Sequence, residues 1–313
     1  MTRYVLRRLA QSLIVVIGMS VLVFSIIHAI PGDPVTTILF GGNATPEQIE
    51  ELRTSLNLDK PLYVQYLLWA QRALQGNLGR SFQTDRAVTT EIAQRLPSTL
   101  ELTAAAMAVA VTMGLGFGAL AATRRNSWID RVSMGAAFIW VAIPYFWLAI
   151  LLVLFFSVRL RWFPALDDGT ARSLVLPAFS LGAAYAAITA RLLRNRLIGV
   201  YGEDYIRTAR ARGLSGGQLL RRHALRNAAI PVVTILGLQV GSMLSGAVLI
   251  EVIFGRPGIG SYLVSGLLSK DIPVVQGVLL FVGVAYLLMN VIVDVSYALL
   301  DPRIRSRYGK PVS

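Results

Sequence analysis

Six apolar stretches, each long enough to cross a lipid bilayer as a helix, constrain this chain more than any other feature. A helix of about 20 residues spans the hydrocarbon core of a membrane. Only 15% of the 313 residues are charged and the mean hydropathy is +0.59, whereas soluble domains carry about 25% charged residues. The sequence therefore predicts an all-α integral membrane protein with six transmembrane helices. These helices are expected at residues 9–30, 100–122, 132–158, 174–193, 228–254 and 274–300.

The first apolar stretch begins after three arginines, Arg3, Arg7 and Arg8, as a secretory signal peptide does. Its apolar run of about 22 residues exceeds the usual 7–15 residues of a signal peptide, and no A-x-A cleavage site follows it. We therefore expect residues 1–30 to be retained, as an N-terminal end followed by the first transmembrane helix.

The basic residues are distributed unevenly between the two sides of the predicted membrane. With six spans, the N-terminus, residues 124–131, the loop 191–227 and the C-terminal tail share one side, and together they hold 19 of the 30 Lys and Arg residues. The positive-inside rule places that side in the cytoplasm. We therefore expect a multi-pass protein of the cell membrane with both termini cytoplasmic. Because topology accounts for most of the net charge of +13, nucleic acid is not an expected partner.

The remaining segments divide the chain into four parts. Residues 31–98 are polar and are expected to form an extracytoplasmic helical segment, with one helix starting at Thr45-Pro46 and a second across residues 63–74. Residues 99–300 are expected to form a five-helix transmembrane core that includes a cytoplasmic loop at 194–227. Residues 301–313 are expected to form a cytoplasmic tail.

The loop 201–231 has the pattern of two short helices joined at a glycine. Glu203 and Asp204 stand at the start of the first helix and Arg210 at its end, as the helix dipole favours. Gly213 can adopt the left-handed conformation that ends a helix. This pattern predicts a stiff helix–glycine–helix elbow, because a second helix follows at once.

The second helix of the elbow begins at Ser215 with Gln218 three residues later, which is a capping box. It runs toward Pro231 and into the next span. Because the elbow joins two membrane spans, a partner that grips it would move both spans together, as coupling between a soluble motor and a membrane gate requires. A helix-turn-helix DNA reader is disfavoured by the short tethers to both spans.

The elbow also resembles a known motif. Arg207-Thr208-Ala209, with Gly213 four residues on and Leu225 later, is similar to the "EAA" loop of ABC-importer permeases. Arg207 stands where that loop usually has Glu, a departure typical of the dipeptide/oligopeptide/nickel branch. The resemblance implies a coupling helix that docks on a separate ATPase. It assigns the docking loop to Asp204, Tyr205, Arg207, Thr208, Ala209, Arg210, Gly213 and Leu214.

Further stretches resemble the same branch along nearly the whole chain. They are Pro31-Gly-Asp-Pro34 and the runs at residues 58–66, 78–81, 95–97, 254–260 and 301–305. The resemblance implies a second homologous permease subunit in a heterodimer, two ATP-binding subunits that carry ATP and Mg, an extracytoplasmic solute-binding protein and surrounding membrane lipid. Its implied solute is a dipeptide or oligopeptide, with nickel chelates and haem-like cargo left open.

A few polar residues lie inside the predicted spans, where an Asp at mid-membrane costs about 2.5–3.5 kcal/mol. Gln239 and Ser242 share one helix face, and Asn290 and Asp294 share another. Either face could line the transport pathway or join helices by hydrogen bonds.

Two glycine features leave similar alternatives open. Gly114 and Gly118 match the G-x-x-x-G pattern that permits close helix contact. The turn at 255–260, which carries Arg256, could gate the outer mouth, meet a binding protein or only reverse the chain.

The sequence shows no sign of an enzyme. It has no G-x-x-x-x-G-K-[ST] phosphate-binding loop, no cysteine and only two widely separated histidines. We expect no catalytic residue, cofactor or metal in this chain, so that ATP hydrolysis falls to partner subunits. The main alternative function is a secondary transporter driven by an ion gradient, which would need intramembrane acids and an internal repeat. A membrane scaffold without transport is not excluded by composition.

Overall fold

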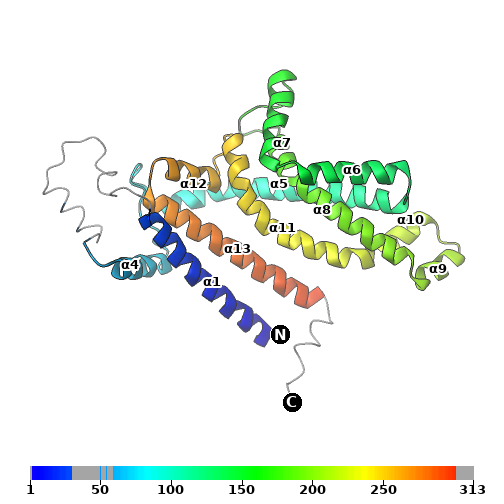
Figure 1. The fold of residues 1–313 in the computed structure, drawn as a ribbon, viewed down its shortest axis with the longest axis horizontal. Helices are drawn as coiled ribbons and strands as arrows, with labels where there is room; N and C mark the ends of the chain where they lie inside the picture. The colour runs from blue at the N-terminus through cyan, green and yellow to red at the C-terminus, as the bar shows by residue number, and fades with distance from the viewer. Residues whose placement is uncertain (1, 30–49, 51–53, 55–58, 301–313) are drawn as a thin grey trace, which may run out of the picture. The chain divides into compact units, whose positions relative to one another are not determined.

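The computed structural model describes residues 2–29, 50, 54 and 59–300. Within these ranges the backbone is helical apart from loops and one isolated β-bridge between Arg80 and Ala87, which confirms the predicted all-α fold (Figure 1). The helices follow in the order α1 (Thr2–Ala29), α4 (Leu62–Leu74), α5 (Val88–Thr123), α6 (Trp128–Ala142), α7 (Tyr145–Leu152), the π-helical η1 (Val153–Arg159), α8 (Val175–Tyr201), α9 (Asp204–Ala211), α10 (Gly216–Gln218), the π-helical η2 (Leu219–Ala224), α11 (Leu225–Ile253), α12 (Ile259–Leu268) and α13 (Ile272–Leu300).

Four of the described helices are long and apolar enough to cross a membrane. They are α5, α8, the Pro231–Ile253 part of α11 and the Ile272–Val293 part of α13. A fifth span is present if α6 and the α7–η1 helix are counted together. The apolar part of α1 among the described residues, Ala10–Ser25, is shorter. The several membrane spans are therefore confirmed, while the count of six stays a prediction.

The third predicted span, at residues 132–158, is not one continuous helix. α6 and the α7–η1 helix meet at 102°. The break falls at Ile143, whose extended backbone (φ −85°, ψ 123°) precedes Pro144. Proline disfavours helical geometry in the residue before it, so the chain turns there. The segment predicted as one span therefore forms two helices, α6 and the α7–η1 helix.

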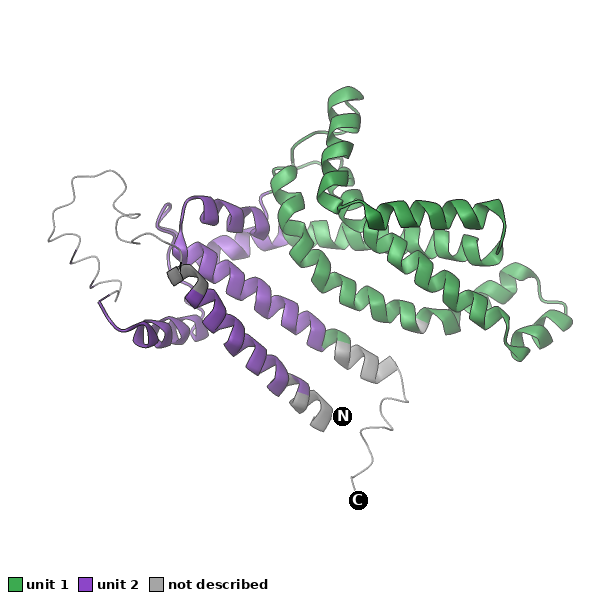
Figure 2. Cartoon of the chain, viewed as in Figure 1, with its two compact units in different colours: residues 1, 99–256, 292–313 green, residues 2–98, 257–291 purple. Residues whose placement is uncertain are grey.

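The chain divides into two compact units, each with its own apolar core (Figure 2). Unit 1 consists of Thr99–Arg256 and the described residues from Ile292, and unit 2 consists of the described residues of Thr2–Ser98 together with Pro257–Val291. In unit 1, buried residues such as Leu102, Leu181 and Ile250 from α5, α8 and α11 pack together. In unit 2, residues from the start of α5 pack against α12 and α13.

Small residues let α5 and α8 approach closely in unit 1. A Cβ atom added at Gly114 would lie 2.7 Å from Thr189 Cβ, and one added at Gly118 would lie 2.7 Å from Ala190 O. A Cβ at Gly182 would come within 2.5 Å of Ala106 O. The G-x-x-x-G pattern at Gly114 and Gly118 therefore marks a real contact between helices.

In unit 2, α4 packs on α1 through aromatic side chains. The Phe24 ring lies 5.5 Å from the Tyr66 ring in an edge-on arrangement and 6.0 Å from the Trp69 ring. The Tyr66 hydroxyl is also hydrogen-bonded to Ser20 Oγ at 2.9 Å. The helix predicted at 63–74 is thus confirmed as α4, while the helix predicted from Thr45 lies outside the described residues.

Candidate functional site

The first helix of the predicted elbow is α9, and its side chains divide into an inner and an outer face. Ile206 and Ala209 are buried, at one turn's spacing, whereas Asp204, Arg207 and Thr208 are exposed. Residues three and four apart lie on the same helix face, so this short helix rests on an apolar underside. Asp204 in its first turn and Arg210 in its last turn match the helix dipole.

Gly213 ends α9 as predicted, with a φ of +81°. The Gly213 amide donates to Arg210 O at 3.0 Å, and the Leu214 amide donates to Ala209 O at 3.4 Å. This pair of bonds is the Schellman arrangement, in which the two residues after a helix satisfy its last carbonyls. Because Gly213 supplies both the left-handed backbone and one of the donors, it fixes the direction in which the chain leaves α9.

The second arm of the elbow begins at Ser215. Its hydroxyl accepts from the Gln218 amide at 3.5 Å, while Gln218 Oε1 accepts from the Ser215 amide at 3.1 Å. The predicted capping box is therefore present. From α10 the chain continues through η2 into α11 as one helical run, so the second arm is the beginning of a membrane span.

The elbow is held to both of the spans that it connects. Ile206, Ala209 and Leu219 form a small buried cluster, against which Val200 and Tyr201 at the end of α8 are packed. Below it, Leu197 of α8 and Ala224 of η2 belong to a second buried cluster. α8, α9 and η2 therefore share buried apolar surface, and η2 continues directly into α11.

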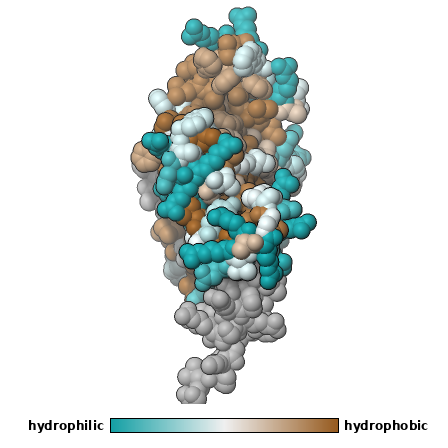
Figure 3. Space-filling view, turned by 90° about the vertical axis from the view of Figure 1, so that its right-hand side faces the viewer, coloured by the Kyte–Doolittle hydropathy of each residue, from teal (hydrophilic) through white to brown (hydrophobic). Residues whose placement is uncertain are grey.

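The outer surface of the elbow is polar and mainly basic. Figure 3 shows the side of unit 1 that carries α9 and α10, and hydrophilic side chains gather on its visible face. The exposed charged residues are Glu203, Asp204, Arg207, Arg210, Arg212, Arg221, Arg222 and Arg226. The Arg207–Asp204 ion pair, 3.5 Å long, leaves both side chains more than two thirds exposed, and such surface pairs contribute little stability. These groups remain available to a partner.

The residues that the resemblance assigned to the docking loop do not all face outward. Asp204, Tyr205, Arg207, Thr208, Arg210 and Gly213 are exposed. Ala209 is buried and Leu214 is half-buried against the cluster beneath α9, so these two support the elbow from within.

Two features that hold the elbow in place were not predicted from the sequence: the buried pair Ile206 and Leu219, and a hydrogen bond to the Tyr205 hydroxyl. Ile206 and Leu219 are almost fully buried beneath α9, and the spacing of Ile206 and Ala209 could have revealed that inner face. The Tyr205 hydroxyl accepts from Asn227 Nδ2 at 2.6 Å, which ties α9 to the start of α11. No sequence pattern predicts this contact across 22 residues.

The predicted pathway residues have different environments. Gln239 is buried, and its side chain lies 3.4 Å from both Thr189 Oγ1 and Tyr185 O of α8. Ser242 is exposed and donates to Leu238 O of its own helix at 3.5 Å. The structure therefore gives Gln239 a helix-joining contact that Ser242 lacks. Asn290 is half-buried on α13, and the side chain of Asp294 lies outside the described residues.

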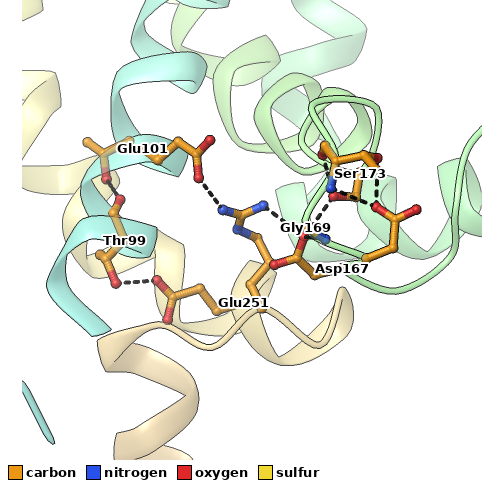
Figure 4. Close-up of polar contacts among 10 residues, drawn as sticks. Thr99, Glu101, Asp167, Gly169, Ser173 and Glu251 are labelled. Carbon is orange, nitrogen blue, oxygen red and sulfur yellow. Dashed lines mark hydrogen bonds and ion pairs between the residues drawn. The ribbon is translucent and has the colours of Figure 1, made fainter. Parts of the chain in front are cut away.

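A network of charged residues lies at the end of α11 opposite the elbow (Figure 4). Arg256 is buried and reaches Glu101 at 2.8 Å and Asp167 at 3.4 Å. Beside it, the buried Glu251 accepts from Thr99 Oγ1 at 2.6 Å. Arg256 thus joins α5 and the loop before α8 to the end of α11 within unit 1. The 255–260 turn accordingly holds its arginine inside the unit and does not present it to a partner.

Among the described residues there is no group of three or more His, Cys, Asp or Glu side chains that could hold a metal ion. What the elbow offers is a rigid basic surface attached to two long apolar helices.

The known proteins that this chain is similar to are membrane components of transport systems. Residues 114–306 match the family described as binding-protein-dependent transport system inner membrane component, and residues 1–103 match the N-terminal family of such membrane components. The chain is 42% identical over 313 residues to a putative peptide transport system permease protein of Brucella abortus (strain 2308), covering 97% of this chain and 99% of that protein. It is 43% identical over 305 residues to the glutathione transport system permease protein GsiC of Escherichia coli O6:H1, with the same coverage.

Solved structures show the same fold. An inward-facing structure of the MetNI methionine ABC transporter matches with a TM-score of 0.58 at 19% identity, over 67% of this chain and 96% of the matched chain. At that identity the likeness establishes the fold alone.

Proposed function

The chain belongs to the family of binding-protein-dependent transport system inner membrane components, and on that premise we propose that it forms half of the translocation pathway of an ATP-driven importer of peptides. It is the permease subunit of an ABC importer. A second homologous permease subunit, two ATP-binding subunits and an extracytoplasmic solute-binding protein complete the proposed assembly. The ATP-binding subunits hydrolyse ATP, and both termini of this chain lie on their side of the membrane.

One observation carries the coupling part of the proposal: an exposed basic elbow shares a buried apolar core with the helices on both sides of it. α9 presents charged residues outward while Ile206 and Leu219 anchor it from below. A partner subunit that binds this surface and changes shape would displace α8 and α11 together, because both helices are joined to the same buried clusters. Asp204, Tyr205, Arg207, Thr208 and Arg210 form the proposed contact surface.

The proposed solute follows from the relatives. Those nearly as long as this chain are named as permeases of peptide and glutathione transport systems, and glutathione is itself a small peptide. Short peptides are therefore the first solutes to test. The binding protein and the second permease subunit contribute to the choice among them.

The coupling proposal is tested by placing proline at two glycines of the elbow. Gly213→Pro cannot keep a φ of +81°, because proline fixes φ near −65° and lacks the amide hydrogen that Gly213 donates to Arg210 O. Gly216→Pro is the matched control, because Gly216 is the first residue of α10, where proline is tolerated and no atom lies within 4 Å of an added Cβ.

Both variants are assembled with their partner subunits in proteoliposomes, and peptide uptake and ATP hydrolysis are measured together. We expect Gly213→Pro to lose at least tenfold in peptide transported per ATP hydrolysed, and Gly216→Pro to transport normally. Normal coupling in a correctly assembled Gly213→Pro variant would refute the role of the elbow.

The same proteoliposomes separate an ATP-driven importer from a secondary transporter. Uptake should stop when ATP is withdrawn while the ion gradients are held, and it should persist when an ionophore collapses the gradients in the presence of ATP. The opposite pattern would support an ion-driven carrier.

A further inference from the structure

A second basic surface lies at the same end of unit 1 as the elbow, at the turn between α5 and α6. We propose that this turn binds the headgroup phosphate of an anionic phospholipid. The surface consists of Arg124, Arg125 and Arg131, all exposed, with the exposed ring of Trp128 between them in the sequence. It is defined below as the α5–α6 basic turn. Its nearness to the elbow follows from Ala122 of α5, which packs in one buried cluster with residues of α8 and η2.

The acidic residue of this turn is already neutralised. Asp130 is buried, and its two carboxylate oxygens accept from Arg194 at 2.6 and 2.7 Å. The same carboxylate accepts from the Asn126 amide at 2.9 Å. Among the described residues, no ion pair joins a carboxylate to the three exposed arginines. The turn therefore presents an excess of positive charge.

The backbone of the turn is held in one conformation. Asn126 has a φ of +64°, and Ser127 caps α6 by accepting from the Asp130 amide at 3.3 Å. Together with the Arg194–Asp130 pair, these bonds fix the position of the first turn of α6 against α8. The arginines consequently need little reordering of the backbone to bind an anion.

The outer face of α6 shows where this surface lies relative to the membrane. Trp128, Val132 and Ile139 recur at helical spacing, with 67%, 59% and 55% of their surface exposed, and Phe138 beside them is 73% exposed. In a membrane protein such an apolar stripe meets acyl chains, and a tryptophan at its end lies at headgroup depth. Arg131 stands one turn after Trp128 on the same face. The arginines are thereby placed where lipid phosphates are.

Lipid phosphate complements the surface in both charge and position. A guanidinium group binds phosphate through two parallel hydrogen bonds, and the acyl chains of the same lipid would cover the stripe along α6. A soluble phosphate would satisfy the arginines, but it has no apolar part that could contact Trp128 and the stripe at the same time. A phospholipid is therefore the occupant that fits the whole surface.

The experiment uses the assembled importer in proteoliposomes and measures quenching of Trp128 fluorescence by brominated lipids. The contribution of Trp128 is obtained by subtraction of a Trp128→Phe variant. Brominated phosphatidylglycerol is compared with brominated phosphatidylcholine at equal mole fraction. Each basic residue near an anionic surface contributes about fivefold in binding, so we expect at least a tenfold preference for phosphatidylglycerol.

A triple variant, R124Q/R125Q/R131Q, should abolish that preference. The matched control R159Q/R161Q/K270Q also removes three exposed basic residues, none of them in the α5–α6 basic turn, and should keep it. Millimolar inorganic phosphate should not reduce the quenching.

Three results would overturn the proposal. They are equal quenching by the two lipids, a preference retained in the triple variant, and absence of quenching by either lipid. The last result would mean that a protein subunit covers Trp128. Because the assay requires no transport, its outcome is independent of the coupling experiment.

Discussion

Replacement of Arg256 by glutamine should destabilise unit 1 far more than replacement of Glu101 by glutamine, although Glu101 is the nearer of the two carboxylates paired with Arg256. The guanidinium side chain of Arg256 is 4% exposed, and that of its partner Asp167 is 12% exposed. Loss of the arginine would leave the Asp167 carboxylate largely buried without its countercharge, a change that costs about 3–5 kcal/mol. Asp167 keeps hydrogen bonds from Ser173 Oγ at 2.7 Å and the Gly169 amide at 3.3 Å, so we expect the lower end, about 3 kcal/mol.

The ion pair between Arg256 and Glu101 should contribute much less to stability than the pair with Asp167. Glu101 lies closer to Arg256, at 2.8 Å, but its side chain is 59% exposed, and exposed pairs contribute about 0–1 kcal/mol. Glu101→Gln should therefore cost less than about 1 kcal/mol. Burial and not distance decides which of the two pairs contributes more.

The measurement is reversible chemical unfolding of the full-length chain in mild detergent, followed by tryptophan fluorescence. Arg256→Gln, Asp167→Asn and the double variant complete a double-mutant cycle. We expect the double variant to be destabilised by about 1–3 kcal/mol less than the sum of the two single-variant destabilisations, because it leaves neither charge unpaired. Equal effects of Arg256→Gln and Glu101→Gln, or additive effects in the cycle, would refute the reasoning.

Two further predictions concern packing and capping. Gly182→Ala should destabilise the chain by about 1–3 kcal/mol, because its Cβ would come within 2.5 Å of a backbone carbonyl of α5. In Gly135→Ala no atom lies within 4 Å of the added Cβ, so this variant should be more stable than the original chain by up to about 1 kcal/mol. Similar unfolding free energies for the two variants would contradict this prediction. Ser215→Ala should cost about 1 kcal/mol of local stability at the second arm of the elbow, because it removes the side-chain cap of that helix. Hydrogen exchange of the Gln218 amide should then be about fivefold faster. Unchanged exchange would show that the cap does not stabilise the helix.

Local patterns in the sequence were sufficient for the elbow. Glu203 and Asp204 at the start of a helix, a glycine after it, and Ser215 with Gln218 each act through backbone groups within a few residues. Neighbouring side chains decide such features, so α9 and the capping box appear where they were predicted. The helix α4 was also predicted, and its predicted and observed bounds differ by one residue.

Predictions about where helices break were less complete. Pro144 marks the place where the third predicted span breaks, but nothing local gives the angle of 102° between α6 and the α7–η1 helix. That angle depends on how the two pieces pack against α8. Similarly, the hydropathy of 100–122 did not reveal that α5 begins at Val88, because the first turns of that helix carry polar residues, including Glu91, that are satisfied by contacts in unit 2.

The sequence by itself determined that this chain lies in a membrane, which family it resembles, and where its exposed elbow begins and turns, because apolar length, charge asymmetry and capping are properties of short segments. Only the tertiary structure decided that Arg256 pairs with Asp167, that Arg194 neutralises Asp130, and that Gln239 joins α11 to α8. Those contacts link residues 50 to 89 positions apart. Their formation depends on the angles and close approach of whole helices, which no short pattern specifies.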